Sequence, residues 1–253
     1  MLNIVLPIAG RGSRFAMAGY PLPKPLIDVH GIPMIEAVVG NIRPVRAHRF
    51  VFLALREHLA CFPLRQTLES AAPGCAIVTV DEVTQGAACT VLLAREFIDT
   101  DDPLMLANSD QWVDVDINHY LEETSRQSAD GLIMTMKADD PKWSFAGLDA
   151  RGLVTRVVEK TAISDEATVG IYNFQRGRDF VRAADRMIAS NLRVNGEFYV
   201  APVYNELIAE GARIVIYNVG REGQGMYGLG IPDDLRRFLD NPISRRALAA
   251  AMP

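Results

Sequence analysis

Residues 2–15 read LNIVLPIAGRGSRF, an apolar run that ends in a glycine-rich turn followed by positive charge. We predict a buried strand over Asn3–Pro7, because a short run of Ile, Val and Leu that ends at a turn is typical of parallel sheets. Gly10 and Gly12 let the backbone approach a ligand closely, and consecutive N–H groups in such a turn form a concave anion-binding surface. The segment therefore predicts a phosphate-binding loop after the first strand.

Two common phosphate-binding motifs do not fit this loop. A dinucleotide fingerprint requires a third glycine where Phe15 stands, and a Walker A motif requires Gly-Lys followed by Ser or Thr. Positive charge is concentrated here instead, since Arg11, Arg14 and Lys24 all precede Asp28, the first acidic residue. Prolines on both sides of Lys24 stiffen the backbone that presents its ammonium group. The alternative interpretation is an ordinary strand–turn–helix junction with solvated arginines.

Beyond this segment, short runs of Val, Ile and Leu alternate with longer stretches of helical period. Such alternation is typical of a largely parallel sheet covered by helices, so the expected class is α/β. The next strands are expected at Phe50–Leu55, Ile77–Val80 and Leu104–Ala107, with a helix from Ala87 to about Phe97. Loops that follow such strands share one sheet edge, where ligands bind in open α/β sheets.

The second half of the chain changes rhythm, with apolar runs separated by short turns. This pattern predicts a smaller antiparallel element built onto the mainly parallel sheet. The expected strands are Leu132–Lys137, Val154–Glu159, Val169–Phe174 and Ile214–Tyr217, and the expected helices are Asp179–Asn191, Val200–Glu210 and the tail after Pro232. No low-complexity linker separates the parts, so we treat residues 1–253 as one domain.

The composition favours a soluble protein that binds neither nucleic acid nor membrane. With 253 residues, 49% of them hydrophobic, the chain can bury a core without disulfides. Its net charge of −5 is opposite in sign to the net charge expected of a nonspecific nucleic-acid binder. No signal-peptide pattern and no membrane-length apolar stretch are visible, so we expect a cytoplasmic protein, and a homo-oligomer is compatible with the sequence. Cys61, Cys75 and Cys89 lack metal-ligand spacing and are expected to be reduced core thiols.

The pattern PxAGxGSRF over residues 7–15, followed by PKPL over residues 23–26, resembles the signature of the sugar-1-phosphate nucleotidyltransferases, glucose-1-phosphate thymidylyltransferase-like members among them. The resemblance implies a Rossmann-like three-layer fold and transfer of a nucleoside monophosphate from a triphosphate to a sugar 1-phosphate, with release of pyrophosphate. It also implies catalytic roles for Arg14 and Lys24. The residues implied to wrap the triphosphate are Ala9, Gly10, Arg11, Gly12 and Ser13.

Two later segments extend the likeness on the nucleotide side. Gln85 and Gly86, ahead of the expected helix, resemble the family's base-reading loop, and the alternative is a polar cap followed by a glycine. Asp110, in Asn-Ser-Asp after the strand Leu104–Ala107, resembles the catalytic aspartate that binds Mg²⁺. Mg²⁺ prefers one or two carboxylates plus phosphate oxygens, which Asp110 and the triphosphate would supply. The alternative interpretation is that Asp110 is a turn or cap residue, as an isolated aspartate after a strand commonly is.

The acceptor side of the likeness begins with Glu159-Lys160, followed by Gly170 and Tyr172. The resemblance implies that the glutamate binds sugar hydroxyls, that the lysine binds the sugar phosphate, and that the glycine leaves room for the sugar ring. Trp143 stands where many relatives have tyrosine and is also assigned to the acceptor pocket. The alternative interpretations are a surface ion pair for Glu159 and Lys160, and core packing for the two aromatic residues.

Departures from the family pattern concern the metal and the acceptor. Gly228 occupies the place of a second metal-binding aspartate, and a glycine offers no side-chain ligand. Asp233 or Asp234 is a candidate substitute from the next turn; otherwise Asp110, the substrates and water hold the metal. Thr161 replaces the proline that usually follows Glu-Lys. We therefore expect a remodelled acceptor pocket.

The resemblance divides the chain into a nucleotide-binding half at about 1–130, an acceptor-binding half at about 131–230 and a helical tail at 231–253. It suggests a role in surface polysaccharide or lipopolysaccharide precursor synthesis, with UTP, CTP and dTTP equally open. Three alternatives stand beside it. They are a cytidylyltransferase for phosphocholine or another nonsugar phosphate, a glycosyltransferase that binds metal through Asp114 and Asp116, and a noncatalytic nucleotide-binding subunit.

Overall fold

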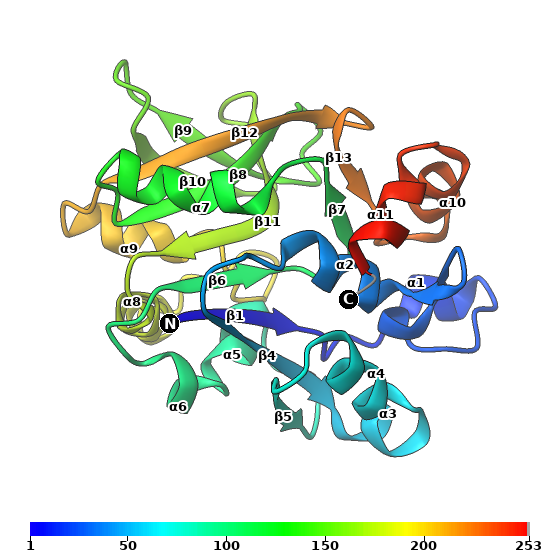
Figure 1. Ribbon diagram of the computed structural model, residues 1–253. Coiled ribbons are helices and arrows are strands. Elements are labelled where there is room, and N and C mark those ends of the chain that lie inside the picture. Colours follow the sequence, from blue (N-terminus) through cyan, green and yellow to red (C-terminus); the bar gives the residue numbers. More distant parts are fainter. Residues whose placement is uncertain (252–253) are drawn as a thin grey trace.

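The computed structural model describes residues 1–251, and the side-chain environments of residues 1–249. A long twisted sheet crosses the molecule with helices on both of its faces (Figure 1). Its parallel part has the order β5-β4-β1-β6, in which β1 lies between β4 and β6. These strands are β1 (Leu2–Pro7), β4 (His48–Leu55), β5 (Ala76–Val80) and β6 (Leu104–Ala107). All four agree with the predicted runs to within two residues at either end.

The antiparallel element predicted for the second half is present. β11 pairs antiparallel with both β6 and β8, β12 then runs parallel to β8, and β9 and β10 form an antiparallel hairpin beside β11. The strands are β7 (Gln111–Val113), β8 (Gly131–Lys137), β9 (Ser144–Leu148), β10 (Val154–Glu159), β11 (Glu166–Phe174), β12 (Ile214–Glu222) and β13 (Gly225–Gly228). A separate two-stranded sheet joins β2 (Asp28–Val29) to β3 (Ile32–Pro33).

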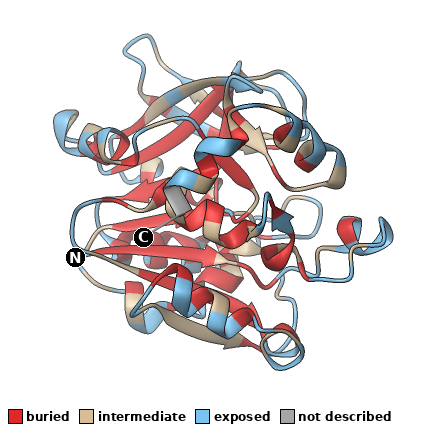
Figure 2. Cartoon of the chain, turned by 45° about the vertical axis from the view of Figure 1, so that its right-hand side comes forward, coloured by how far each residue is buried: buried red, intermediate tan, exposed pale blue. Residues whose placement is uncertain are grey.

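Two hydrophobic clusters cover the two faces of the sheet, which makes the fold three-layered as expected. Alternate residues of β1 enter opposite clusters, since Ile4 and Leu6 pack on one face and Val5 on the other. Figure 2 shows the buried residues concentrated in the central strands. The helices that contribute to the first face are α1 (Ser13–Met17), α2 (Met34–Ile42), α3 (Arg56–Cys61), α4 (Leu64–Ala71), α7 (Ile117–Arg126), α10 (Pro232–Asp240) and α11 (Ser244–Ala251). Those on the second face are α5 (Ala87–Leu92), α6 (Arg95–Ile98), α8 (Gly177–Ala189) and α9 (Val203–Ala209).

Two predictions about local structure are wrong. The single helix expected over 87–97 is two helices, α5 and α6, because the N–H groups of Leu93 and Ala94 bond three residues back, to Thr90 and Val91, and this tightens the turn between them. The three cysteines are not all core thiols, because Cys61, the last residue of α3, is exposed.

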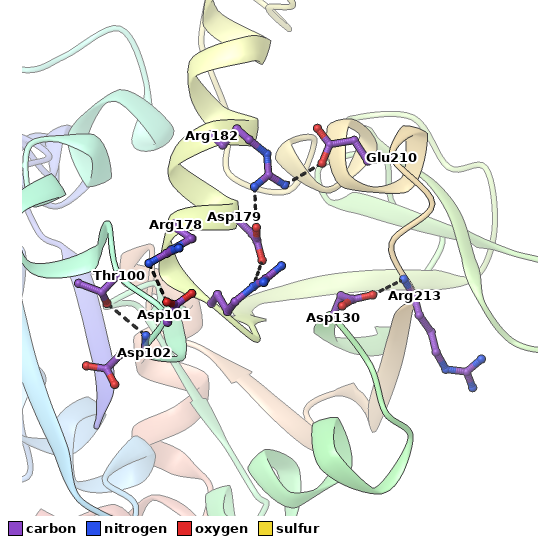
Figure 3. A network of polar contacts seen from close by, with 10 residues as sticks. Thr100, Asp101, Asp102, Asp130, Arg178, Asp179, Arg182, Glu210 and Arg213 are labelled. Carbon is purple, nitrogen blue, oxygen red and sulfur yellow. Dashed lines mark hydrogen bonds and ion pairs between the residues drawn. The ribbon is translucent and has the colours of Figure 1, made fainter.

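The edge formed by the amino ends of the parallel strands carries a network of ion pairs (Figure 3). Arg182 of α8 bridges Asp179 and Glu210 at 2.7 Å each, which ties α8 to the end of α9. Arg178 pairs with Asp101 at 2.7 Å, just before β6. Within residues 1–251 no helix has the length and apolar character to span a bilayer.

Candidate active site

A cavity of about 370 Å³ opens at the edge formed by the carboxyl ends of the parallel strands. Its wall is built from segments far apart in the sequence. These are the start of α1, the start of α5, the loop after β6, the β8–β9 connection, the end of β10, the middle of β11, the 199–201 segment and the segment from β13 into α10. This is the edge at which open α/β sheets bind ligands.

One of the two cations predicted to be catalytic lines the cavity, and the other is bonded to a residue that does. Arg14 lines the cavity from the first turn of α1. Lys24 lies beside the loop, since a side chain at Gly12 would contact its Cβ at 3.4 Å, and its Nζ donates to Asp110 Oδ2 at 2.9 Å. The 3₁₀ turn Lys24–Leu26 begins at this lysine, so the flanking prolines do shape its backbone. Arg14 and Asp110 therefore line the cavity, and Lys24 is connected to it through its bond to Asp110.

The remaining residues of the loop lie outside the lining of this cavity. Ala9 packs in the core with Ala88 of α5, whereas Gly10, Arg11 and Ser13 are exposed. Around Gly10 a side chain would meet nothing within 4 Å, so the backbone there is open to a ligand. The assignment of this turn to the triphosphate stays a prediction.

Two carboxylates approach the segment between β13 and α10. Asp110 lies against Gly230, where a Cβ would come within 2.8 Å of its Oδ2. Asp234, in the first turn of α10, lies against Gly228, where a Cβ would come within 3.1 Å of its Oδ2. Burial raises the pKa of Asp234, with a further rise from Glu222. The carboxylate of Asp234 therefore lies next to the position that a side chain at residue 228 would take. Asp234 and Asp110 line the same cavity.

The acceptor side of the cavity is formed by the end of β10 and its neighbours. Glu159 is only 7% exposed, which rules out the surface ion pair as its description. Ser144 donates a hydrogen bond to its carboxylate, and Lys160 Nζ lies 4.0 Å away. Burial raises the pKa of Glu159, against the opposing effects of Ser144 and Lys160. The backbone of Lys160 is in the left-handed region, with a φ of 56°. A proline at position 161 would disfavour this conformation, which is consistent with the threonine found there.

Aromatic side chains complete the acceptor side. Trp143 lines the cavity with its indole Nε1 buried and without a hydrogen-bond partner among the described residues. Lys142 Nζ lies 4.8 Å from the centre of the Trp143 ring, and Lys160 Nζ lies 5.5 Å from that of Tyr199. Tyr172 also lines the cavity, but its hydroxyl is hydrogen-bonded to Thr168 Oγ1 at 2.9 Å. All five residues predicted on the acceptor side therefore meet around one cavity.

Gly170 lies in close contact with Asn108. Its φ is +81°, and a Cβ there would lie 2.2 Å from Asn108 Nδ2 and 2.8 Å from Asn108 Cγ. The backbone N–H of Asn108 donates to the carbonyl of Gly170 at 2.9 Å. The missing side chain thus makes room for Asn108, which lines the cavity together with Gly170 itself, and the role of Gly170 in leaving space for a sugar ring stays a prediction.

Gln85 and Gly86 lie where α5 begins, and α5 packs against β1. A Cβ at Gly86 would lie 2.4 Å from the carbonyl oxygen of Phe198, so the glycine permits close contact with that segment. Phe198 N–H donates to Gln85 O at 2.9 Å, and Ala88 N–H donates to Phe198 O at 3.0 Å. Of this turn only Ala87 lines the cavity. Gln85 also contacts Arg193, a residue that no sequence pattern singled out.

Several polar residues that line the cavity, Tyr199, Gln111 and Lys142 among them, were not assigned to the site from the sequence. Tyr199 ends the segment Asn195–Tyr199, which resembles the Glu-Phe-Tyr-Leu-Thr-Asp stretch of the sugar-1-phosphate nucleotidyltransferases, and this resemblance is the sequence signal for it. Gln111 and Lys142 line the cavity without any such signal. The two aspartates proposed for a glycosyltransferase lie elsewhere, because Asp114 pairs with Arg246 at 2.8 Å and Asp116 caps α7 through Asn118.

The three-layer fold and this cavity define a nucleotide-dependent class of α/β protein. Residues 3–190 match the nucleotidyl transferase family, and the chain belongs to that family. It is 28% identical over 214 residues to the bifunctional protein GlmU of Thermotoga sp. (strain RQ2), across 82% of this chain and 44% of that protein. The chain thus spans less than half the length of this curated relative.

Solved structures share the whole fold. The nucleoside-diphosphate-sugar pyrophosphorylase from Vibrio cholerae RC9 has a TM-score of 0.79 and 27% identity, over 95% of this chain and 100% of that one. A UDP-glucose pyrophosphorylase complexed with UDP-glucose has a TM-score of 0.75 and 14% identity, over 98% and 99%. A putative glucose-1-phosphate thymidylyltransferase from Bacillus anthracis, in complex with a sucrose, has a TM-score of 0.73 and 20% identity, over 100% and 97%. The last two likenesses show the fold alone.

Proposed function

We propose that the protein transfers a nucleoside monophosphate from a nucleoside triphosphate to a sugar 1-phosphate and releases pyrophosphate. The observation that carries the proposal is one cavity at the carboxyl edge of the parallel strands that is lined by Arg14, Asp110, Glu159 and Lys160, with Lys24 bonded to Asp110. The name of the Vibrio cholerae protein, which matches nearly the whole chain, supports the same activity.

The residues of the cavity suit a reaction between two anions. In-line attack of an acceptor phosphate oxygen on the α-phosphorus needs positioning and charge neutralisation rather than a covalent nucleophile. Within the described residues no carboxylate pairs with Arg14, so its charge is free for the phosphates. Lys24 neutralises Asp110 here and would turn to the triphosphate when the nucleotide binds, and Lys160 would hold the acceptor phosphate from the other wall.

Mg²⁺ is the proposed cofactor, and the donor set fits it. Asp110 and Asp234 line one cavity, which matches the preference of Mg²⁺ for one or two carboxylates together with phosphate oxygens. We assign the metal to these two residues, with Asp234 in place of the side chain that Gly228 lacks. When bound, Mg²⁺ would polarise phosphate oxygens and neutralise their charge. No cluster of three His, Cys, Asp or Glu side chains is present in the described residues, so phosphates and water would supply the other ligands.

The acceptor chemistry favours a sugar phosphate over phosphocholine. An aromatic face attracts a cation, but the Trp143 and Tyr199 rings are each already close to a lysine of the protein itself. A quaternary ammonium would have to displace Lys142 or Lys160. Glu159 instead presents a buried carboxylate to hydroxyl donors. The further expectation of surface polysaccharide synthesis rests on the resemblance and belongs to the proposal on that basis.

The test is a matrix of nucleoside triphosphates against sugar 1-phosphates and phosphocholine, with Mg²⁺ and pyrophosphate release as the readout. Lys24→Ala is expected to lower the rate by about 100- to 1000-fold, as for other electrostatic groups in active sites. Lys137→Ala is the matched control, because Lys137 pairs with Asp165 and Glu166 and does not line the cavity. Nucleotide binding without pyrophosphate release from any pair would contradict the proposal and favour the noncatalytic subunit.

A further inference from the structure

Ser144 and Glu159 face each other across the hairpin of β9 and β10. They are paired residues of the antiparallel register, which brings their side chains together on one face of the sheet. The Ser144 hydroxyl donates a hydrogen bond to Glu159 Oε2, and both residues line the cavity. Both are more than nine-tenths buried, at 8% and 7% exposure. The pair is therefore a packed part of the cavity wall.

The backbone on both sides of Glu159 is held by other residues. The Asn205 side chain of α9 bonds both backbone groups of Val157, accepting from its N–H at 2.7 Å and donating to its carbonyl at 2.8 Å. On the other side, the N–H of Lys160 donates to the carbonyl of Trp143 at 3.0 Å. A glutamate side chain on such a backbone still rotates about its own bonds, and ordering it costs conformational entropy. A separate contact is therefore needed to fix the direction of the carboxylate.

The Ser144 hydroxyl is that contact. Among residues 1–249 it is the one group that donates a hydrogen bond to the Glu159 carboxylate, since Lys160 Nζ lies 4.0 Å from Oε1. A carboxylate has about four acceptor sites, so most of its capacity remains for groups inside the cavity. The hydroxyl has a single proton, and while this proton points to Glu159 the Ser144 oxygen can only accept. Ser144 and an ionised Glu159 thus complement the hydroxyl donors of a sugar.

The charged groups around the carboxylate oppose one another. Burial raises the pKa of Glu159 and Glu197 raises it further, whereas the Ser144 hydrogen bond and the Lys160 ammonium lower it. The other titratable neighbours stay neutral because burial raises their pKa values, and they are Tyr172 and Tyr199. Of the two groups that favour the charged form, only Ser144 is within hydrogen-bond distance. Loss of its hydroxyl would favour the protonated form of Glu159.

We infer that Ser144 is a positioning residue of the acceptor site, whose hydroxyl holds the Glu159 carboxylate in the orientation that accepts hydrogen bonds from the hydroxyl groups of a sugar 1-phosphate. The inference rests on the proposed function and deepens it on the acceptor side. Because Ser144 acts through Glu159, its loss should weaken recognition of the acceptor and leave recognition of the nucleotide unchanged.

The experiment measures steady-state pyrophosphate release by the full chain with Mg²⁺, using the nucleoside triphosphate and sugar 1-phosphate that react fastest in the matrix described above. Ser144→Ala is expected to raise KM for the sugar 1-phosphate about tenfold, the effect of one hydrogen bond to a charged group, and to leave KM for the nucleotide unchanged. The acid limb of kcat/KM for the acceptor should also move to higher pH, because the carboxylate loses a donor that favours its charged form. Ser144→Thr keeps the hydroxyl and should restore both readouts.

Ser164→Ala is the matched control. The Ser164 hydroxyl donates to the carbonyl of Ala146 in β9 at 2.7 Å, and Ser164 does not line the cavity, so both KM values should stay at the wild-type level. The double variant Ser144→Ala with Glu159→Ala should match Glu159→Ala alone, because a residue that acts through Glu159 then has nothing left to position.

An unchanged acceptor KM in folded Ser144→Ala overturns the inference, and so does an equal rise of KM for both substrates. Additive effects in the double variant overturn it too, since Ser144 would then act independently of Glu159. If Ser144→Ala does not fold, Ser144→Cys, of similar shape and with a weaker donor, decides by the same measurements. These outcomes leave the transfer reaction intact, whereas no pyrophosphate release by wild-type protein from any pair contradicts the proposed function itself.

Discussion

Replacement of Gly170 by alanine tests the packing at the centre of the cavity. Gly170 lies in β11 with a φ of +81°, a conformation that costs an L-residue about 1 to 2 kcal/mol. The new Cβ would also lie 2.2 Å from Asn108 Nδ2 and 3.2 Å from Asn108 Cβ, so the asparagine has to move. Overpacking of this kind costs about 1 to 3 kcal/mol. The expected loss of unfolding free energy is therefore about 2 to 5 kcal/mol.

The two contributions separate in urea unfolding experiments at constant m-value. Gly152→Ala measures the backbone contribution alone, because Gly152 has a φ of +78° with nothing within 4 Å of its Cβ position. It should cost about 1 to 2 kcal/mol. The double variant Asn108→Ala with Gly170→Ala removes the contact with the amide and should recover at least about 1 kcal/mol relative to additivity.

A Gly170→Ala variant no less stable than Gly152→Ala would refute the close approach of Asn108. Additive effects in the double variant would refute it as well, because residues that do not touch show no coupling. Either result would return Gly170 to the role implied by the resemblance, which is space for the acceptor. The measurement thus decides which neighbour the glycine serves.

Two further predictions concern the carboxylates of the cavity. Asp234→Asn is expected to raise the Mg²⁺ concentration needed for half-maximal pyrophosphate release by about tenfold, consistent with the loss of a group that supports the metal. Asp233→Asn is the control and should leave that concentration unchanged, because Asp233 is exposed and paired with Arg236. Equal behaviour of the two variants would exclude Asp234 from the metal site. Burial raises the pKa of Glu159, so its ionised form destabilises the folded chain above that pKa and the penalty disappears as the pH falls. Glu159→Gln should therefore raise Tm at pH 7, with the gain lost near pH 4 in calorimetry, and a gain independent of pH would contradict this origin.

The strands of the parallel sheet could be predicted because burial on both faces leaves a continuous apolar run in the sequence. β6 begins and ends as predicted, at Leu104 and Ala107. The short strands β7 and β13 carry no such signal. Their residues Gln-Trp-Val and Gly-Met-Tyr-Gly become strands because they pair with each other, Tyr227 opposite Trp112, at the end of the sheet. Such partners are known only once the chain has folded.

The residues of the candidate site also fall into those that the sequence predicts and those that only the fold reveals. Residues within contiguous motifs, such as Glu159 and Lys160, could be placed on the acceptor side from the sequence. Arg193 could not, because its relation to Gln85 spans 108 residues and depends on a hairpin turn that only the fold brings alongside α5. Asp234 was one of two candidates, and only the structure separates it from Asp233, which points to Arg236 instead.

The Lys24–Asp110 pair couples the two ligands that the cavity is proposed to bind. Lys24 cannot neutralise a triphosphate and Asp110 at the same time, since its ammonium lies 2.9 Å from the carboxylate in the free protein. A nucleotide that draws Lys24 away leaves Asp110 close to phosphate charge, which is unfavourable at the low effective dielectric of a partly buried site. A divalent cation removes that penalty, and a nucleotide in turn removes the competition of Lys24 for Asp110. Under the proposed function each ligand would therefore strengthen the binding of the other by the same factor, as linkage requires.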